Sequence, residues 1–246
     1  MRKQERLNAI LDRVTERGAV DVNDLADSLG VSGATVRRDL QALSSSKLLV
    51  RTHGGAVARL VDAAEADSHL AEKRRIGAAA ATVVDRGAVV GLTGGTTALE
   101  VARALADRSD VTFVTNAINI ASELVGRPGL RLVVIGGIVR SSFELVGPAA
   151  EAMLANYHLD IAFIGVDGLT PQEGCTTHDE MEAQTDRAFL RRARRSIVIS
   201  DSSKIGKVTF ARICTVSDVD EIITDRGITS EQLHGLSIAG AHVTTV

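Results

Sequence analysis

Aromatic side chains are scarce in this chain. Its 246 residues include five Phe, one Tyr and no Trp, so aromatic residues make up 2% of the sequence. Proteins that recognise RNA or single-stranded DNA commonly stack the bases on aromatic rings. The composition therefore argues against a protein that binds unpaired bases by stacking.

Cysteine is also rare, and the sequence contains no metal-ligand spacing. Cys175 and Cys214 lie far apart in the sequence, and the six His form no HxxxH or Cys/His cluster. We therefore expect no metal and no cofactor. The two cysteines are expected to be reduced thiols, which is their usual state in a cytosolic protein.

Long apolar runs are missing as well. Hydrophobic residues make up 45% of the chain, but no run of eighteen or more apolar residues occurs. The opening residues MRKQE lead into an amphipathic helix pattern and not into the apolar core of a signal peptide. The sequence therefore predicts a cytoplasmic protein without membrane contacts, long enough for one small domain and one of ordinary size.

The segment VDVNDLADSLGVSGATVRRDLQAL, residues 20–43, has the pattern of two short helices joined by a tight turn. Gly30 stands at the turn, where a positive φ is often needed, and Ser32 is placed to cap the second helix. Apolar residues recur near the helical period on both sides of the turn: Leu25, Ala26 and Leu29 before it, and Val31, Val36, Leu40 and Leu43 after it. The segment therefore predicts two packed helices.

The outward face of the second helix allows two interpretations of this segment. It carries small polar groups at its start and two guanidinium groups behind them: Ser32, Gly33, Thr35, Arg37 and Arg38. A helix-turn-helix needs such a face, because its second helix enters the major groove of DNA and reaches base edges and phosphates. The alternative is an ordinary helical hairpin with a charged outer face.

The next segment favours DNA binding. KLLVRTHGGAV, residues 47–57, has the pattern of two short strands around a glycine-containing turn, which after a recognition helix is the wing of a winged helix. Arg51 and His53 are then placed to contact phosphate or the minor groove. Residues 1–59 hold ten Lys or Arg and seven Asp or Glu, a net charge of +3, whereas the whole chain carries −3. The remainder is therefore −6, and the basic excess lies where DNA would bind.

Residues 2–57 resemble the DNA-binding domain of the DeoR family of bacterial transcriptional regulators. The resemblance rests on the opening RKQERLNAIL, on TVRRDLQAL at 35–43 and on LLVRTHGGAV at 48–57. It implies that residues 1–57 form a winged helix-turn-helix domain whose partner is a double-stranded DNA operator.

The rest of the chain has the pattern of an α/β domain. Residues 58–70 are small and charged and predict a linker, and residues 71–246 predict a domain that opens with a helix from about 71 to 85. Short runs rich in Val and Ile follow, most of them separated by helical patterns: 88–92, 111–115, 130–136, 159–165, 195–200 and 221–225. Such alternation is typical of a Rossmann-like, mainly parallel sheet covered on both faces.

Ligands of open α/β sheets bind outside the carboxyl ends of the strands, and the first of these ends has the pattern of an anion site. Gly94, Gly95, Thr96 and Thr97 lead into a helical pattern at 98–106. Glycines allow close approach of the backbone, hydroxyls donate hydrogen bonds, and a helix N-terminus presents free N–H groups. We favour a phosphate or carboxylate cradle over the alternative, a purely structural turn.

The other strand ends offer further polar groups. They are Asn116, Gly136, Gly137, Asp167, Asp201 and Lys204. An amine beside a phosphate cradle, with an amide and carboxylates for hydroxyls, suits a phosphorylated sugar or polyol. Alternatively, Asp201 and Lys204 simply pair and cap a helix.

These motifs also resemble the effector domain of the DeoR family. They are GGTTALEVA (94–102), TNAINIA (115–121), IGG (135–137), GVDGL (165–169), GCTT (174–177) and DSSKIG (201–206), in family order. The resemblance implies a sugar-phosphate sensor with a fold similar to that of ribose-5-phosphate isomerase. One departure is that the family commonly has an aspartate and a small residue before Gly-Thr-Thr, where this chain has Thr93 and Gly94.

Two functions follow from these patterns. The first is a sequence-specific DNA-binding regulator, a repressor of sugar or polyol genes controlled by a phosphorylated sugar metabolite. The second is a sugar-phosphate isomerase-like enzyme. The second needs a placed general base, but residues 174–182, GCTTHDEME, lack the glycine run that carries the catalytic glutamate of that enzyme. We therefore expect a non-enzymatic repressor, and at least a homodimer because one winged helix reads few base pairs.

Overall fold

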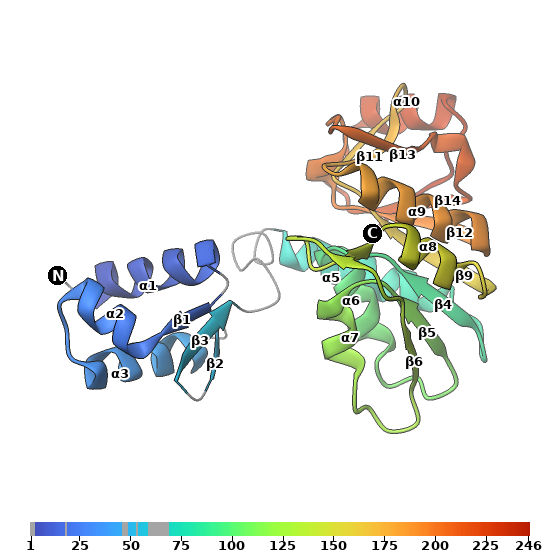
Figure 1. Ribbon diagram of the computed structural model, residues 1–246. Helices are drawn as coiled ribbons and strands as arrows, with labels where there is room; N and C mark the ends of the chain where they lie inside the picture. Colours follow the sequence, from blue (N-terminus) through green and yellow to red (C-terminus); the bar gives the residue numbers. More distant parts are fainter. Residues whose placement is uncertain (1–2, 18, 46–48, 53, 59–68) are drawn as a thin grey trace. The chain divides into compact units, whose positions relative to one another are not determined.

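The computed structural model describes residues 3–17, 19–45, 49–52, 54–58 and 69–246. The chain divides into two compact units, residues 1–67 and 68–246 (Figure 1). The predicted linker at 58–70 lies mostly outside the described residues; within it, Ala58 ends a strand and Leu70 begins a helix.

The first unit contains the predicted helix pair and hairpin. Its helices are α1 (Lys3–Arg17), α2 (Val22–Leu29) and α3 (Gly33–Ser45), and its strands are β1 (Ala19–Asp21), β2 (Leu49–Arg51) and β3 (Gly55–Ala58). The strands form an antiparallel sheet in the order β1-β3-β2. The wing hairpin is thus joined by β1, a strand that the sequence analysis did not predict.

Local chemistry explains the turn between α2 and α3. Gly30 ends α2 with φ +64, a left-handed conformation that glycine adopts without the steric cost borne by other residues. Ser32 accepts a hydrogen bond from the Thr35 backbone N–H at 3.3 Å, as an N-cap does. The predicted apolar residues Leu25, Val36 and Leu40 are buried together with others of this unit.

The second unit is built on a seven-stranded sheet. Its strands are β4 (Val89–Leu92), β5 (Thr112–Thr115), β6 (Arg131–Val134), β9 (Leu159–Gly165), β12 (Ala193–Ile199), β14 (Glu221–Thr224) and β15 (Val243–Thr245). All neighbours are parallel, in the order β15-β14-β12-β9-β4-β5-β6. The six predicted strands are confirmed to within two residues at each end, and β15 is an addition.

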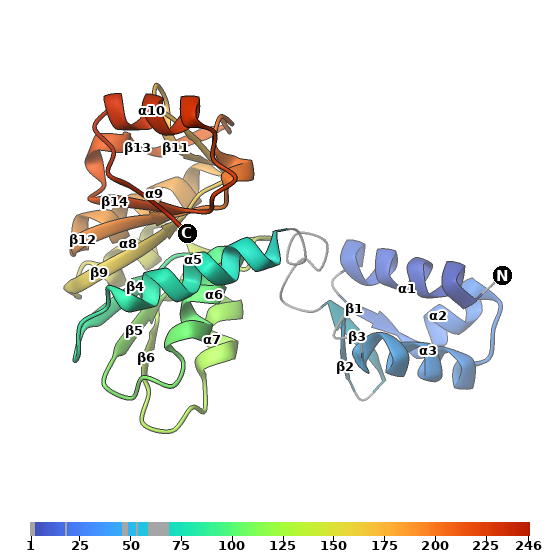
Figure 2. The ribbon, with the colours of Figure 1, turned by 180° about the vertical axis from the view of Figure 1, so that it is seen from behind.

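Helices cover both faces of this sheet (Figures 1 and 2). They are α5 (Leu70–Thr82), α6 (Thr96–Leu105) and α7 (Ile118–Leu124) on one face, and α8 (Pro148–Leu154) and α9 (Glu180–Arg192) on the other, followed by α10 (Ser230–Ile238). Because both faces are covered, strand residues such as Phe113, Phe163 and Val198 are fully buried. This burial explains why the strands read as continuous apolar runs.

Two smaller elements were not predicted from the sequence. One is a hairpin of β7 (Ile138–Val139) and β8 (Leu145–Val146), and the other is an antiparallel sheet of β10 (Gly168–Thr170), β11 (Gly174–Thr177) and β13 (Ala211–Cys214). In this small sheet Cys175 lies directly opposite Cys214, although the two are far apart in sequence. The short helical turns η1 (Ser202–Lys204) and η2 (Val216–Asp218) complete the unit.

Candidate functional site

The exposed face of α3 is the candidate DNA interface. Arg37 and Arg38 are exposed, and Asp39, the residue after them, is buried and accepts a hydrogen bond from Arg6 of α1 at 2.5 Å. The acidic residue of the helix is therefore neutralised inside the unit, whereas its two arginines face solvent. This arrangement suits contact with phosphates and base edges.

The other residues predicted to bind DNA have different surroundings. The hydroxyls of Ser32 and Thr35 lie 3.0 Å apart, and Gly33 is the first, half-buried residue of α3. Arg51 is in β2, but its side chain lies outside what the structure describes, and His53 lies outside the described residues. Contact of these residues with DNA stays a prediction.

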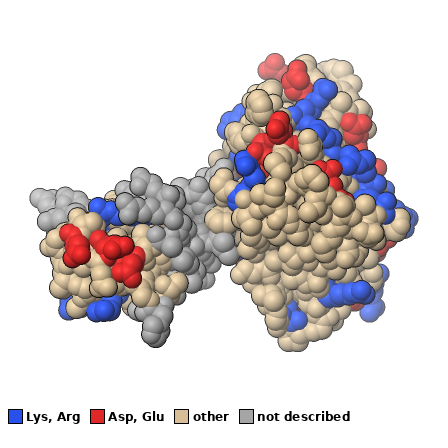
Figure 3. Space-filling view, viewed as in Figure 1, with Lys and Arg blue, Asp and Glu red and all other residues tan. Residues whose placement is uncertain are grey.

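A second face of the same unit is acidic. Asp24 and Asp27 of α2 are exposed, and Figure 3 shows Asp and Glu gathered on the side of this unit turned to the viewer, with Lys and Arg at its edges. The separation of charge means that α3, and not the exposed side of α2, suits the approach of DNA phosphates.

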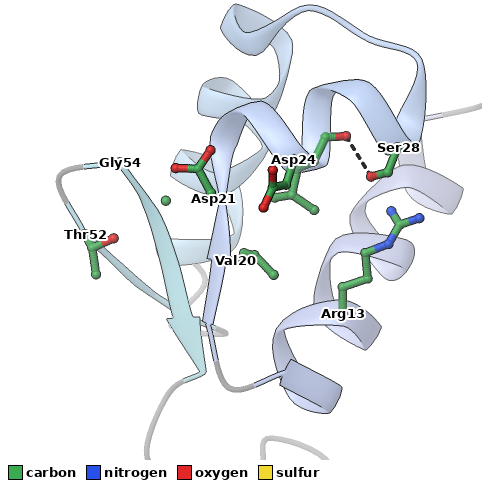
Figure 4. Close-up of a pocket in the computed structure, with 9 residues that line it drawn as sticks. Arg13, Val20, Asp21, Asp24, Ser28, Thr52 and Gly54 are labelled. Carbon is green, nitrogen blue, oxygen red and sulfur yellow. Dashed lines mark hydrogen bonds between the residues drawn. The ribbon is translucent and has the colours of Figure 1, made fainter.

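A cavity of about 410 Å³ lies in this unit, between α1, β1, α2 and the turn after β2. Asp21, Asp24, Arg13 and Ser28 line it, and Ser28 donates a hydrogen bond to the Leu25 carbonyl at 3.2 Å (Figure 4). Two carboxylates against one guanidinium make this lining unsuitable for phosphate.

The candidate effector site lies where the strand order of the large sheet reverses. From β4 the chain proceeds through β5 and β6 on one side, and it then returns to β9 on the other side of β4. In open α/β sheets, ligands bind outside the carboxyl ends of the strands at such a switch point. This switch point contains the predicted glycine loop.

The loops after β4 and β9 pack closely. The Gly165 backbone N–H donates to the Thr93 hydroxyl at 2.9 Å, and a Cβ on Gly165 would lie 2.5 Å from the Gly94 carbonyl oxygen. Gly95 precedes the first turn of α6 with φ +102, and no side chain caps this helix. Since Thr96 and Thr97 begin the helix, its first N–H groups are free of a side-chain cap and suit an anion.

A carboxyl group that the sequence analysis missed lies against this loop. Glu144, between β7 and β8, is buried, and a Cβ on Gly94 would lie 2.1 Å from its Oε1 atom. The predicted residue Asn116 donates from Nδ2 to Glu144 Oε2 at 3.1 Å and to the Leu145 carbonyl at 3.2 Å. Glu144 thus joins the ends of β4 and β5.

Two more of the predicted residues, Asp167 and Lys204, lie close together at the same edge of the sheet. Lys204 Nζ lies 3.4 Å from Asp167 Oδ1, and the Thr177 hydroxyl lies 3.0 Å from Asp167 Oδ2. The same hydroxyl lies 3.1 Å from Glu182 Oε2, and Ser142 donates to Glu182 Oε1 at 2.5 Å. These contacts connect the ends of β9 and β11 with α9 and the β7–β8 hairpin.

The remaining predicted residues have structural contacts. The Gly136 N–H points to the sulfur of Met153 at 3.4 Å, and Gly137 packs so closely on β8 that a Cβ would lie 2.6 Å from the Val146 carbonyl oxygen. Asp201 is buried and caps η1 by accepting from the Ser203 N–H at 3.1 Å, which is the capping alternative considered above. Their roles in effector binding stay predictions.

Burial changes the acid–base properties of this edge. The pKa of Glu144 is raised to about 8, chiefly by burial and then by the charges of Glu182 and Asp167, with the Asn116 hydrogen bond acting in the opposite direction. The pKa of Asp186 in α9 is raised well above its usual value, again chiefly by burial. At neutral pH the Glu144 carboxyl therefore favours the uncharged form and is able to donate as well as accept hydrogen bonds.

Glu144, Glu182 and Arg140 come from segments to which the sequence analysis assigned no site. Arg140 forms an ion pair with Asp179 at the start of α9. Glu144 stands between Phe143 and Leu145-Val146, and an acid inside an apolar stretch was the available signal. Among the described residues, no group of three His, Cys, Asp or Glu is arranged to hold a metal ion.

Each of the two units is similar to a known protein domain. The DeoR-like helix-turn-helix domain matches residues 6–59, and the DeoR C terminal sensor domain matches residues 68–226. The molecule is a DNA-binding transcriptional regulator with a separate α/β sensor domain. It belongs to the DeoR family.

Two relatives match over nearly their full length. The chain is 38% identical to a putative aga operon transcriptional repressor from Escherichia coli O157:H7, over 98% of this chain and 93% of the relative. It is 30% identical to the glycerol-3-phosphate regulon repressor of Escherichia coli strain K12, over 92% of each chain.

Among solved structures, ribose 5-phosphate isomerase A from Methanocaldococcus jannaschii is similar at 20% identity and a TM-score of 0.39, over 56% of this chain and 55% of that one. RipA from Yersinia pestis is similar at 19% identity and a TM-score of 0.45, over 70% and 49%. Within the described residues, every helix is too short or too polar to cross a membrane.

Proposed function

We propose that this protein represses genes of sugar or polyol metabolism and that a phosphorylated sugar or polyol changes its affinity for its operator. The observation that carries the proposal is the pairing of two surfaces in one chain. One is the α3 face with Arg37 and Arg38, and the other is the switch-point edge with the 94–97 loop and Lys204. A ligand that binds one conformation more tightly shifts the affinity for DNA through linkage.

The names of the relatives support the metabolic class. One is called a repressor of the aga operon and another a repressor of the glycerol-3-phosphate regulon. The switch-point edge suits such ligands, because the 94–97 loop offers backbone N–H groups and hydroxyls to a phosphate. Asn116, Asp167 and Lys204 offer an amide, a carboxylate and an amine to the rest of the molecule.

The test combines two measurements on the full chain. Thermal unfolding is followed with a panel of phosphorylated sugars, polyols and sugar acids, because a ligand that binds only the folded state raises the Tm. Compounds that raise the Tm are then added to complexes with DNA duplexes selected from a random pool. We expect at least one phosphate ester to change DNA affinity and its dephosphorylated form to have no effect. Failure of every ester to change either quantity would contradict the proposal.

The isomerase-like alternative gains one observation from the structure. Glu144 and Glu182 are buried carboxyl groups at the switch-point edge, and an isomerase needs a general base in such a place. We nevertheless propose binding without chemistry, since the 174–182 segment lacks the glycine run expected of the enzyme. An assay of ketose–aldose interconversion decides between the two. Turnover that Lys204→Ala abolishes would establish the enzyme instead.

We further propose that the protein acts as at least a homodimer on an operator with repeated or inverted half-sites. One winged helix contacts too few base pairs for specificity within a genome, and two joined copies double the length of DNA that is read. Light scattering at micromolar concentration tests this assembly. A monomeric mass both with and without DNA would contradict it.

A further inference from the structure

The Glu144 carboxyl is an unusual polar group of the second unit, because it is buried and lies against a glycine loop. The side chain is nine-tenths buried, at 9% exposure, and its carboxyl lies where the side chain of any residue other than glycine at position 94 would lie. Gly94 is also the first residue of the loop to which the proposed function assigns the effector phosphate. A carboxyl group has therefore been brought to the edge of a proposed anion site.

The orientation of Glu144 is strongly specified. Phe143, the residue before it, has a φ of +64, which is uncommon for a residue with a side chain. The Phe143 N–H donates to the Arg140 carbonyl at 3.0 Å, which closes the tight turn of the hairpin. At the other end of Glu144, Asn116 donates to Oε2 at 3.1 Å. The hairpin thus holds the carboxyl against the 94–97 loop.

A neighbouring buried atom without a hydrogen-bond partner indicates that a ligand binds beside Glu144. Asn116 is fully buried, and its Oδ1 atom accepts no hydrogen bond from any described residue. A buried acceptor without a donor costs free energy, and such atoms in native proteins usually have a partner. Asn116 Nδ2 donates a hydrogen bond to the Glu144 carboxyl. The oxygen without a partner therefore belongs to the same amide group that orients this carboxyl.

Resting on the proposed function, we propose that Glu144 is an effector-contacting, specificity-determining residue whose carboxyl group donates a hydrogen bond to an oxygen of the effector phosphate. Asn116 Oδ1 accepts from a hydroxyl of the same effector. The loop and the hairpin then contact the phosphate from two directions. An ionised carboxylate at this place would repel a phosphate dianion, so binding requires the protonated acid.

The acidic groups around Glu144 favour its protonated form. Glu182 and Asp186 face it from α9 and Asp167 from the end of β9, and the charges of Glu182 and Asp167 raise the pKa of Glu144. Two cations lie in the same region, but each is engaged with another acid: Lys204 with Asp167, and Arg140 with Asp179. Burial and these acids bring the pKa of Glu144 to about 8, so the protonated form prevails at neutral pH.

Proton linkage provides a readout that a merely structural role would not change. Glycerol 3-phosphate and glucose 6-phosphate serve as probes, because their phosphate groups remain dianionic above pH 7.5. With a pKa of about 8, the protonated fraction of Glu144 falls roughly eightfold between pH 7.5 and 9.0. We expect the Kd of a bound probe to rise by about this factor in the wild-type protein and to stay nearly constant in Glu144→Gln, whose amide donates at every pH. Glu180→Gln, exposed at the start of α9, is the matched control and should keep the wild-type profile.

A second measurement needs no variant. Calorimetry of the wild-type protein at pH 8.5, in two buffers of different ionisation enthalpy, should show uptake of about three-quarters of a proton per ligand. Binding without proton uptake, or equal pH profiles of wild type and Glu144→Gln, would overturn this inference and leave the proposed function intact. Failure of the wild-type protein to bind any phosphate ester at any pH would overturn the proposed function itself, and this inference with it.

Discussion

The two units of this protein differ in how their charged side chains are paired and exposed. In the first unit the buried acid, Asp39, has a guanidinium partner in Arg6, and the arginines at 37 and 38 are exposed. At the switch-point edge of the second unit, by contrast, buried acids lie near one another, and the pKa values of Glu144 and Asp186 are raised, chiefly by burial and then by the charges of the neighbouring acids. The first unit therefore presents permanent charge to a partner, whereas the second keeps polar groups buried at the edge that suits a ligand.

The difference is the one expected of a DNA reader and a small-molecule sensor. DNA is a dense, extended anion, so exposed cations on one helix suffice to attract it. A small ligand is recognised by few groups, and these must be held precisely and shielded from water. The following experiments test whether the two units are as separate as this comparison implies.

The largest expected effect is the unfolding of the first unit alone. Leu25 of α2 is buried at 1% exposure in a small core, and Leu25→Ala removes packing worth about 2–5 kcal/mol. Calorimetry should show the transition of residues 1–67 shifted to much lower temperature, with DNA binding lost and the transition of residues 68–246 unchanged. Asp27→Ala, an exposed change on the same helix, is the control. A shift of both transitions together would contradict the separation of the units.

Next in size is the loss of the ligand response. Lys204→Ala removes a charged hydrogen-bond donor worth about 1.5–3 kcal/mol from the proposed effector site, since hydrogen bonds to charged groups have this strength. We expect operator affinity without ligand to remain and the response to a phosphate ester to disappear, as measured by fluorescence anisotropy. Normal calorimetric affinity for the ester in this variant would place the effector site elsewhere.

Substitution of the recognition-helix arginines should have a comparable or smaller effect. Arg37→Ala or Arg38→Ala is expected to weaken operator binding by about 1–3 kcal/mol where the lost contact reads a base. A contact to phosphate alone would weaken all sequences equally and reduce the salt dependence. Arg86→Ala, at a fully exposed arginine of the second unit, serves as control. If neither variant changes binding while circular dichroism shows an intact fold, α3 is not the recognition helix.

The smallest effect concerns stability and pH. The folded-state pKa of Glu144, about 8, lies above the ordinary value of 4.5, so between these values the folded state holds more protons than the unfolded state. The free energy of unfolding of the second unit should therefore fall as pH rises, by about 1 kcal/mol between pH 7 and 9 from this group. Urea unfolding at both pH values measures the fall, and Glu144→Gln should lack this part of it. An equal fall in the variant would mean that other groups cause it.

How much of the structure could be predicted from the sequence depends on how local the contacts are. The helix-turn-helix is local: its turn glycine, its cap and its apolar stripes all lie within residues 20–43, and each was found there. The parallel strands were also recognisable, because burial on both faces makes them apolar runs. The predicted glycine loop does lie at the switch point of the sheet.

Non-local contacts could not be predicted in this way. Glu144 meets Gly94 and Asn116 only because the β7–β8 hairpin folds back over the ends of β4 and β5. Cys175 and Cys214 likewise become neighbours through the pairing of β11 with β13, two strands too short to stand out in the sequence. Strand ends identify an edge, but the side chains that other segments bring to it depend on the assembled fold.

The strand order has a practical consequence for dividing the protein. β4, β5 and β6 come from one continuous stretch of chain, and β9, β12, β14 and β15 come from another. The two stretches meet at the switch-point edge, and the chain passes between them once, through the segment that includes α8 and the exposed Asn156. A gene cut at Asn156 would encode two fragments, each with one side of this edge. A molecule that binds residues of both sides would favour their reassembly, so fragments fused to the halves of a reporter enzyme would form a biosensor for that molecule.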